Sequence, residues 1–205
     1  LAGSLTVANV QATGISTVNM QNGGTGTLVM PAGDMTVTME DAITGAMIFT
    51  DTGSATTDSL TLSSASTDAE NLINGNNLTV NGYETVNYST TTAGAATAQV
   101  VDVVTINEDT GGTGTFNVSG SNVYTSGGII TADVIDASGM TAQTAGTVTF
   151  NMVTFLPALS GGATAHTITG SPGDDTLLAG NGIAATLNGG DGSDTLTGHT
   201  GADTI

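Results

Sequence analysis

Glycine and aspartate recur at a nine-residue spacing in residues 170–205, the part of the chain with the clearest chemistry. The best copy, residues 189–197, has the sequence GGDGSDTLT, and partial copies begin at Gly170 and Gly198. A turn rich in glycine can direct several backbone carbonyls inward without Cβ clashes, and an aspartate beside it adds negative charge. Carbonyl and carboxylate oxygens are the ligands that Ca²⁺ prefers. The spacing therefore predicts a ladder of calcium-binding turns.

An apolar side chain follows each of these aspartates by two residues, as Leu177 follows Asp175 and Leu196 follows Asp194. We expect this side chain to lie on a short strand and to point into the core. The first half of each nonapeptide would then form a metal-binding turn, and the second half a strand of the core. A single repeat would bury almost no apolar surface, so the repeats must stack on one another.

The pattern G-G-x-G-x-D-x-U-x resembles the calcium repeat of RTX proteins, and residues 189–197 match it at every defined position. The resemblance implies calcium as the cofactor. It also implies a parallel β-roll in which successive nonapeptides lie on alternate sides, with each ion between turns n and n+2. The metal-ligating residues that it implies are Gly170, Gly173, Asp175, Gly189, Gly190, Asp191, Gly192, Asp194, Gly201 and Asp203.

On the geometry of a β-roll, Asp175 pairs with Asp194 in one well-formed site. The intervening copy, residues 179–187, has Ala184 in place of the aspartate, and one extra residue precedes the next copy. Asp203 would therefore face a weakened half-site, where a second calcium site would be poor or absent. A flexible loop rich in Gly and Asp is the alternative for this segment, although such a loop would not keep a nine-residue register.

The 205-residue chain has 18 acidic residues, no Lys and no Arg, which gives a formal net charge of −18. Its carboxylates must be hydrated, hydrogen-bonded or neutralised by metal, and bound Ca²⁺ would relieve their repulsion. Phosphate binding depends on Lys and Arg, so nucleic acid is a very poor partner, and attraction to anionic lipid is equally poor. No run of about 18 apolar residues occurs, so no membrane insertion is expected.

Residues that could build a catalytic site are scarce, and we predict that the chain is not an enzyme. There is no Cys, no H-E-x-x-H motif and no G-x-S-x-G motif. His166 and His199 are expected to be exposed turn residues rather than ligands or bases. Residues 180–185 satisfy a loose dinucleotide-binding pattern, but they lack the following helix and fall within the calcium ladder.

Short runs of alternating apolar and polar residues fill residues 1–168, as in residues 35–39 (MTVTM) and 147–152 (TVTFNM). Clusters of Gly, Asn and Asp separate the runs, and no segment shows sustained helical periodicity. We therefore predict an all-β fold: a parallel β-solenoid (β-helix) over residues 1–168 that continues into a calcium-binding RTX β-roll over residues 169–205, truncated at the C-terminus. A β-sandwich with long loops is the alternative.

Paired apolar positions recur at roughly 18 to 23 residues, which is the period expected if each coil of a solenoid spans two or three strands. The pairs are Val18/Met20, Val37/Met39, Leu60/Leu62, Leu78/Val80 and Val101/Val103. Residues 100–106 are almost continuously apolar, and Asp102 in their middle must face water or a cation.

Acidic residues also gather at turns outside the nonapeptides. The pairs Glu40-Asp41 and Glu108-Asp109 and the loop from Asp51 to Asp58 are candidates for further calcium binding between coils. Solvated acidic loops are the alternative.

Residues 81–87 (NGYETVN) resemble the G-x-E-T-x-N rung of RTX-type bacterial surface-layer proteins and large RTX adhesins. Residues 134–141 (VIDASGMT) are similar to the D-A-S-G rung of the same proteins. The resemblance implies a secreted structural protein at the bacterial cell surface, exported by type I secretion, that assembles with itself into a surface layer, lattice or filament. Cell-surface polysaccharide is a further candidate partner.

Two other functions fit the same resemblance. An RTX adhesin would bind a glycan or a surface, and an exposed platform of Tyr83, Tyr88 or Tyr124 would favour it. The non-catalytic tail of an exported enzyme would need a catalytic domain upstream. The chain begins with Leu1 and ends within a repeat, so we expect it to be a fragment of a longer polypeptide.

Overall fold

A computed structural model gives the structure of the chain. It describes residues 2–6, 16–20, 24–64, 73, 75–91, 99–109, 111–122, 124–126, 130–140, 149–151, 165–170, 175–178, 184–198 and 201–205. All regular elements in these segments are strands. The same segments contain no helix with the length and apolar character needed to cross a membrane.

The strands are short and follow one another closely. Their bounds are β1 (Ala2–Thr6), β2 (Thr17–Met20), β3 (Thr25–Met30), β4 (Met35–Met39), β5 (Met47–Asp51), β6 (Ser59–Ser64), β7 (Leu78–Asn81), β8 (Thr85–Ser89), β9 (Gln99–Val101), β10 (Val104–Asn107), β11 (Thr115–Gly120), β12 (Tyr124–Ser126), β13 (Ile130–Thr131), β14 (Val134–Met140), β15 (Thr149–Asn151), β16 (Ala165–Thr169), β17 (Thr176–Leu178), β18 (Ala184–Asn188) and β19 (Thr195–Thr197).

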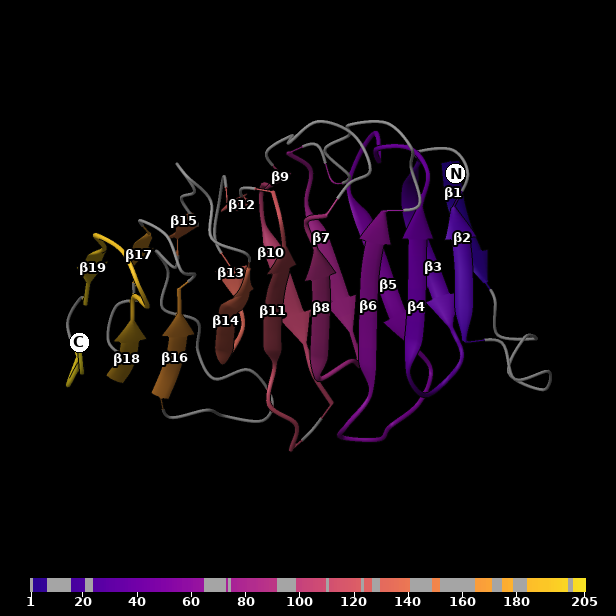
Figure 1. Cartoon of the computed structure of the whole chain (residues 1–205). Coiled ribbons are helices and arrows are strands. Elements are labelled where there is room, and N and C mark those ends of the chain that lie inside the picture. The colour runs from indigo at the N-terminus through magenta and orange to yellow at the C-terminus, as the bar shows by residue number, and fades with distance from the viewer. Residues whose placement is uncertain are drawn as a thin grey trace.

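The strands form three sheets in which every pairing given by the register is parallel. Sheet A has the order β1-β3-β5-β7-β10-β13, sheet B has the order β2-β4-β6-β8-β11-β14-β16-β18, and sheet C has the order β9-β12-β15-β17-β19. Figure 1 shows the strands stacked side by side, with the two ends of the chain at opposite ends of the stack. The predicted all-β fold with parallel strands is confirmed, and this stacking is consistent with the expected solenoid.

The chain changes its path through the sheets twice. From β1 to β6 it alternates between sheets A and B, and from β7 to β15 it visits A, B and C in turn. From β16 to β19 it alternates between sheets B and C. We call one passage through the sheets a coil. Sheet B takes part in all three paths, so it connects the first coils to the nonapeptide repeats.

Alternating side chains build the core, because successive residues of a strand point to opposite faces. In β4, Met35, Val37 and Met39 are buried and the two Thr between them are half-buried. Parallel register stacks like on like: Val18 of β2 lies beside Val37 of β4, which lies beside Leu62 of β6. The core is therefore a set of aliphatic ladders that run along the stack.

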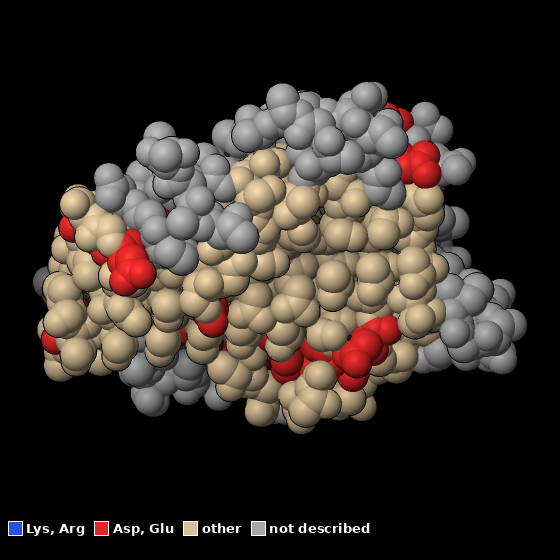
Figure 2. All heavy atoms as spheres, in the orientation of Figure 1, with Lys and Arg blue, Asp and Glu red and all other residues tan. Residues whose placement is uncertain are grey.

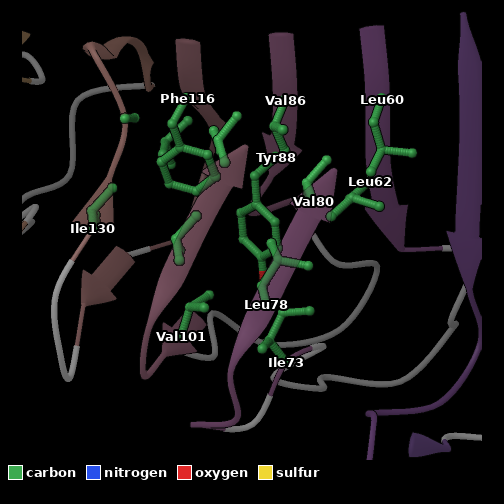
Figure 3. Close-up of a cluster of buried hydrophobic side chains, with 14 of the residues drawn as sticks. Leu60, Leu62, Ile73, Leu78, Val80, Val86, Tyr88, Val101, Phe116 and Ile130 are labelled. Carbon is green, nitrogen blue, oxygen red and sulfur yellow. The ribbon is translucent and has the colours of Figure 1, made fainter. Parts of the chain in front are cut away.

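An aromatic cluster fills the coils where sheet C joins sheets A and B. The rings of Tyr88, Phe116 and Tyr124 lie 5.9–6.4 Å apart between centroids, in tilted or edge-on pairs. The Tyr88 hydroxyl is within 3.0 Å of Gln99 Oε1, at the first residue of β9. Figure 3 shows the Tyr88 and Phe116 rings among the surrounding aliphatic side chains. A third sheet widens the interior, and bulky rings fill that space.

The structure refines two details of the sequence pattern. The apolar run of residues 100–106 divides between two strands, because β9 ends at Val101 and β10 begins at Val104, and Asp102 is exposed at the corner between them, in agreement with the expectation that it faces water or a cation. The paired apolar positions also do not belong to one series. The first three pairs are rungs of sheet B, whereas Leu78/Val80 belongs to sheet A and Val101 to sheet C.

Truncation of Phe116 tests this core. Phe116→Ala removes a fully buried ring that contacts Tyr88 and Tyr124, and we expect it to lower the free energy of unfolding by about 3–5 kcal/mol. The matched control is Thr61→Ala, at a half-buried position on the outer face of sheet B, which should cost within about 0.5 kcal/mol. Urea unfolding in the presence of Ca²⁺ measures both. Equal losses in the two variants would contradict the position of Phe116 in the core.

Candidate calcium site

The nonapeptide strands lie on alternate sides of the stack. Strands β16 and β18 belong to sheet B, and β17 and β19 belong to sheet C. A bridge between Thr186 and Thr204 adds the next rung to sheet B. Each repeat therefore lies beside the repeat two places further along, which is the arrangement that the resemblance to RTX proteins implies.

Asp175 and Asp194 are neighbours across two consecutive turns on one side. The strands that follow them pair in register, Thr176 with Thr195 and Leu177 with Leu196. The Asp175 N–H donates to Asp194 Oδ1 at 3.0 Å, and the Thr195 N–H donates to the Asp175 carbonyl at 2.8 Å. Asp175 is only 2% exposed. The structure thus brings together the two aspartates that sequence reasoning paired.

Each aspartate of the ladder lies against the glycine five residues before it. A Cβ atom on Gly170 would overlap the Asp175 carboxylate and the Gly189 carbonyl oxygen, and a Cβ on Gly189 would overlap the Asp194 carboxylate. Gly198 has the same relation to Asp203. The first position of each repeat therefore requires glycine, because a carboxylate lies where a Cβ atom would be. The sequence pattern alone does not indicate this role of the glycine.

Other glycines of the repeat 189–197 act through backbone conformation. Gly190 has φ of 97° and Gly192 has φ of 126°, values that side chains rarely permit. Asp191 between them is exposed, and Gly201 of the next repeat is exposed as well. Gly173, His199 and the side chain of His166 lie outside the described residues.

The missing aspartate belongs at Ala185 and not at Ala184. The Ala185 N–H donates to Asp203 Oδ1 at 3.0 Å, and the Thr204 N–H donates to the Ala185 carbonyl at 2.8 Å. These bonds reproduce the relation of Asp175 to Asp194. Ala185 is 3% exposed and begins the sequence A-T-L, which aligns with D-T-L at Asp175 and Asp194. Sequence reasoning placed the extra residue after this repeat and so shifted the register by one position.

The residues present fit a calcium ion better than a metal that needs several charged side chains. The described segments hold no group of three or more His, Asp or Glu side chains arranged for a metal. Instead, Asp175, Asp194 and Asp203 each place one carboxylate against a glycine, and the Gly189 carbonyl oxygen also lies close to Gly170, beside the Asp175 carboxylate. Calcium accepts such mixed oxygen ligands and supplies charge neutralisation and cross-linking of adjacent turns rather than catalysis.

Comparison with known proteins identifies the same segment. The family of RTX calcium-binding nonapeptide repeats, in four copies, matches residues 159–183 and 185–205. Neither a curated protein nor a solved structure matches the chain. Repeats of this family bind calcium, are typical of secreted proteins and are usually non-catalytic. Residues 159–183 and 185–205 of this chain thus match the RTX calcium-binding nonapeptide repeats.

Proposed function

We propose that the chain is a structural segment of a secreted bacterial surface protein whose folding depends on Ca²⁺ and whose folded form assembles with itself into a layer, lattice or filament. The observation that carries the proposal is the stacking of Asp175 on Asp194 in a chain without Lys or Arg. Stacked carboxylates repel each other unless a cation lies between them. The fold of the repeats therefore depends on the ion.

Asp175 and Asp194 form the firm calcium site of this proposal. Their carboxylates supply the charge, and the carbonyls of the turns that contain Gly170, Gly189, Gly190 and Gly192 complete the oxygen ligands. The turn that contains Asp203 faces Ala185 and lacks one carboxylate, so it forms the weaker site. A ligand that binds only the folded chain stabilises it in proportion to RT ln(1 + [L]/Kd). Export into a calcium-rich exterior would then fold the repeats, which suits type I secretion of an unfolded chain.

Self-assembly is supported by the outer face of sheet B. Polar, uncharged side chains occupy the outward positions of β4, β6, β8 and β11, among them Thr38, Thr61, Asn87 and Asn117, and Asp136 of β14 bounds this uncharged area. Asn117 Nδ2 donates to Asn87 Oδ1 at 2.9 Å, so this face is an ordered ladder. Figure 2 shows the corresponding surface free of acidic atoms across its middle. Two copies of the chain can approach along this face without the repulsion that a net charge of −18 otherwise causes.

The tyrosines give no support to a glycan-binding adhesin. Tyr83, Tyr88 and Tyr124 are all 0% exposed, so none offers a ring on which a sugar could stack. Binding of a cell-surface polysaccharide would have to use the polar ladders instead. A role as the non-catalytic tail of an exported enzyme would require a catalytic domain. No feature of the described residues favours this role.

Restoring the missing aspartate tests the calcium register. Ala185→Asp places a carboxylate opposite Asp203 with the geometry of the Asp175–Asp194 pair, and we expect one additional Ca²⁺ per chain. Ala184→Asp is the matched control, since it adds the same charge one residue earlier, at a half-buried position. Equilibrium dialysis with ⁴⁵Ca²⁺ counts the ions. A gain with Ala184→Asp but not with Ala185→Asp would refute the register.

Calcium titration tests assembly. We expect circular dichroism to show a gain of β structure with Ca²⁺, and electron microscopy of the same samples to show arrays or filaments that dissolve on addition of chelator. Asp194→Asn should shift both transitions to higher calcium concentration, whereas Asp102→Asn, at an exposed corner, should shift neither. A calcium-folded chain that stays monomeric at high concentration would contradict the assembly proposal and leave the calcium proposal standing.

A further inference from the structure

Acidic residues line the turns that lead from sheet A to sheet B, which we call the A–B corner. Figure 2 shows acidic atoms gathered along the lower edge of the molecule, beneath the central strands of sheet B. The acidic residues of the A–B corner are Asp34, Asp51, Asp58, Glu84, Glu108, Asp109 and Asp133. None of them belongs to a nonapeptide repeat, and the chain has no Lys or Arg to pair with them.

Several of these carboxylates are satisfied by hydrogen bonds from neighbouring coils. Glu84 accepts from the N–H groups of Asp58 and Asp109, both at 3.0 Å, and so joins the coils before and after its own. Asp133 Oδ2 accepts from the Gly114 N–H at 2.9 Å. Asp34 Oδ1 accepts from Ser59 N–H and Oγ at 2.9 and 2.8 Å. These bonds give the carboxylate oxygens of Glu84, Asp133 and Asp34 hydrogen-bond donors within the fold.

Asp51 and Asp58 differ from this pattern: they flank one turn of the A–B corner and are 6% and 8% exposed. Asp109, in a later turn of the same corner, also has a buried Oδ2 without a hydrogen-bond partner among the described residues. Asp51 Oδ1 accepts from the Gly53 N–H at 2.9 Å, but the buried Oδ2 atoms of Asp51 and Asp58 have no hydrogen-bond partner among the described residues. Burial, and then the neighbouring Asp58 side chain, raise the pKa of Asp51 to about 6. The pair therefore places two acidic groups side by side at a buried position that has no Lys or Arg near it.

Tyr83 of the next coil adds an uncharged oxygen beside the pair. Its side chain is fully buried, and its hydroxyl has no hydrogen-bond partner among the described residues. Burial, and then the negative charges of Asp51, Asp58 and Asp34, raise the pKa of Tyr83, which keeps the hydroxyl protonated. A buried hydroxyl without a hydrogen-bond partner is destabilising, because it has lost its hydrogen bonds to water. A ligand at the carboxylate pair would give this hydroxyl a partner.

We propose that Asp51 and Asp58 bind a calcium ion at the A–B corner, outside the nonapeptide repeats. The two carboxylates supply charge, and water and backbone carbonyls of the turn between them supply further oxygens, as hard cations require. The Tyr83 hydroxyl donates a hydrogen bond to this ligand shell. A pair of carboxylates with neutral oxygens agrees with the finding that no three acidic side chains of the described segments converge on a metal position.

The proposed ion would join successive coils in the first half of the chain. Asp51 ends β5, Asp58 precedes β6, and Tyr83 lies in the following coil between β7 and β8. Gly82 lies against Asp51, because a Cβ on Gly82 would be 3.3 Å from the Asp51 Cβ. Calcium at this corner would therefore stabilise the stacking of coils far along the chain from the repeats.

Terbium luminescence isolates this site. Tb³⁺ replaces Ca²⁺ at oxygen sites and emits when a nearby aromatic side chain is excited, and this chain has no Trp and three Tyr. Tyr83 lies at the proposed site, whereas Tyr88 and Tyr124 are buried in the core. We expect tyrosine-sensitised emission from the full chain that competing Ca²⁺ displaces, that Tyr83→Phe largely abolishes, and that the double variant Asp51→Asn/Asp58→Asn also abolishes.

Control variants distinguish calcium binding at this site from two alternatives: binding in the repeats, and a proton shared between Asp51 and Asp58. Asp194→Asn, in the repeats, and Asp102→Asn, at an exposed corner, should leave the emission intact. In chelator, Asp58→Asn should raise the thermal midpoint, because it removes repulsion between carboxylates, and this rise also shows that the variant folds. Its additional stabilisation by Ca²⁺ should be smaller than that of the unaltered chain. Emission that persists in the double variant would overturn the proposal. So would a Ca²⁺-induced rise in the thermal midpoint that is the same in Asp58→Asn as in the unaltered chain. The explanation would then be a proton shared between the two carboxyl groups.

Discussion

The structure depends on how 18 carboxylates are accommodated in a chain that has no Lys or Arg. An isolated buried carboxylate is costly unless it is hydrogen-bonded or paired with a cation. Stacked coils provide hydrogen bonds to these carboxylates, because the turns at each corner present backbone N–H groups to the adjacent coil. Glu84 uses two of these groups and Asp133 uses one. Asp51 accepts one backbone N–H, but the buried Oδ2 atoms of Asp51 and Asp58 have no such donor, and it is there that we propose a calcium ion.

The same constraint explains the glycines that accompany the acids. Gly170, Gly189 and Gly198 leave room for a carboxylate that a Cβ atom would displace. Gly112 does so for Glu84 at the A–B corner, where a Cβ would lie 2.6 Å from Glu84 Cγ. Glycine and acid thus act as a pair at both places, five residues apart within a repeat and on adjacent coils at the corner. The conformational freedom of glycine, at Gly190 and Gly192, is a separate requirement of the turns.

Sequence reasoning could predict the strands and the pairing of Asp175 with Asp194. The strands follow from the two-residue alternation of apolar and polar residues, and the pairing follows from the nine-residue repeat. Alternation in residues 35–39 marks β4 directly, and the nine-residue spacing sets the two-repeat offset. It could not assign strands to sheets, since Leu78 and Val37 have the same pattern but lie in sheets A and B. It also missed the register at Ala185, because one inserted residue moves every later position, and only the bond to Asp203 fixes the alignment. The partners of Glu84 come from other coils, so no local pattern reveals them.

Stacked coils contact only their neighbours, so stabilisation of one coil passes to the next through the interface between them and weakens with distance. Sheet B carries this coupling from β18 back to β2, but sheet A ends at β13 and shares no strand with the repeats. Calcium bound at Asp175 and Asp194 lies on the side of sheet C, which begins only at β9. The first coils, built from sheets A and B alone, therefore receive the effect of that ion only through sheet B. A calcium ion at Asp51 and Asp58, as proposed above, would stabilise these first coils directly.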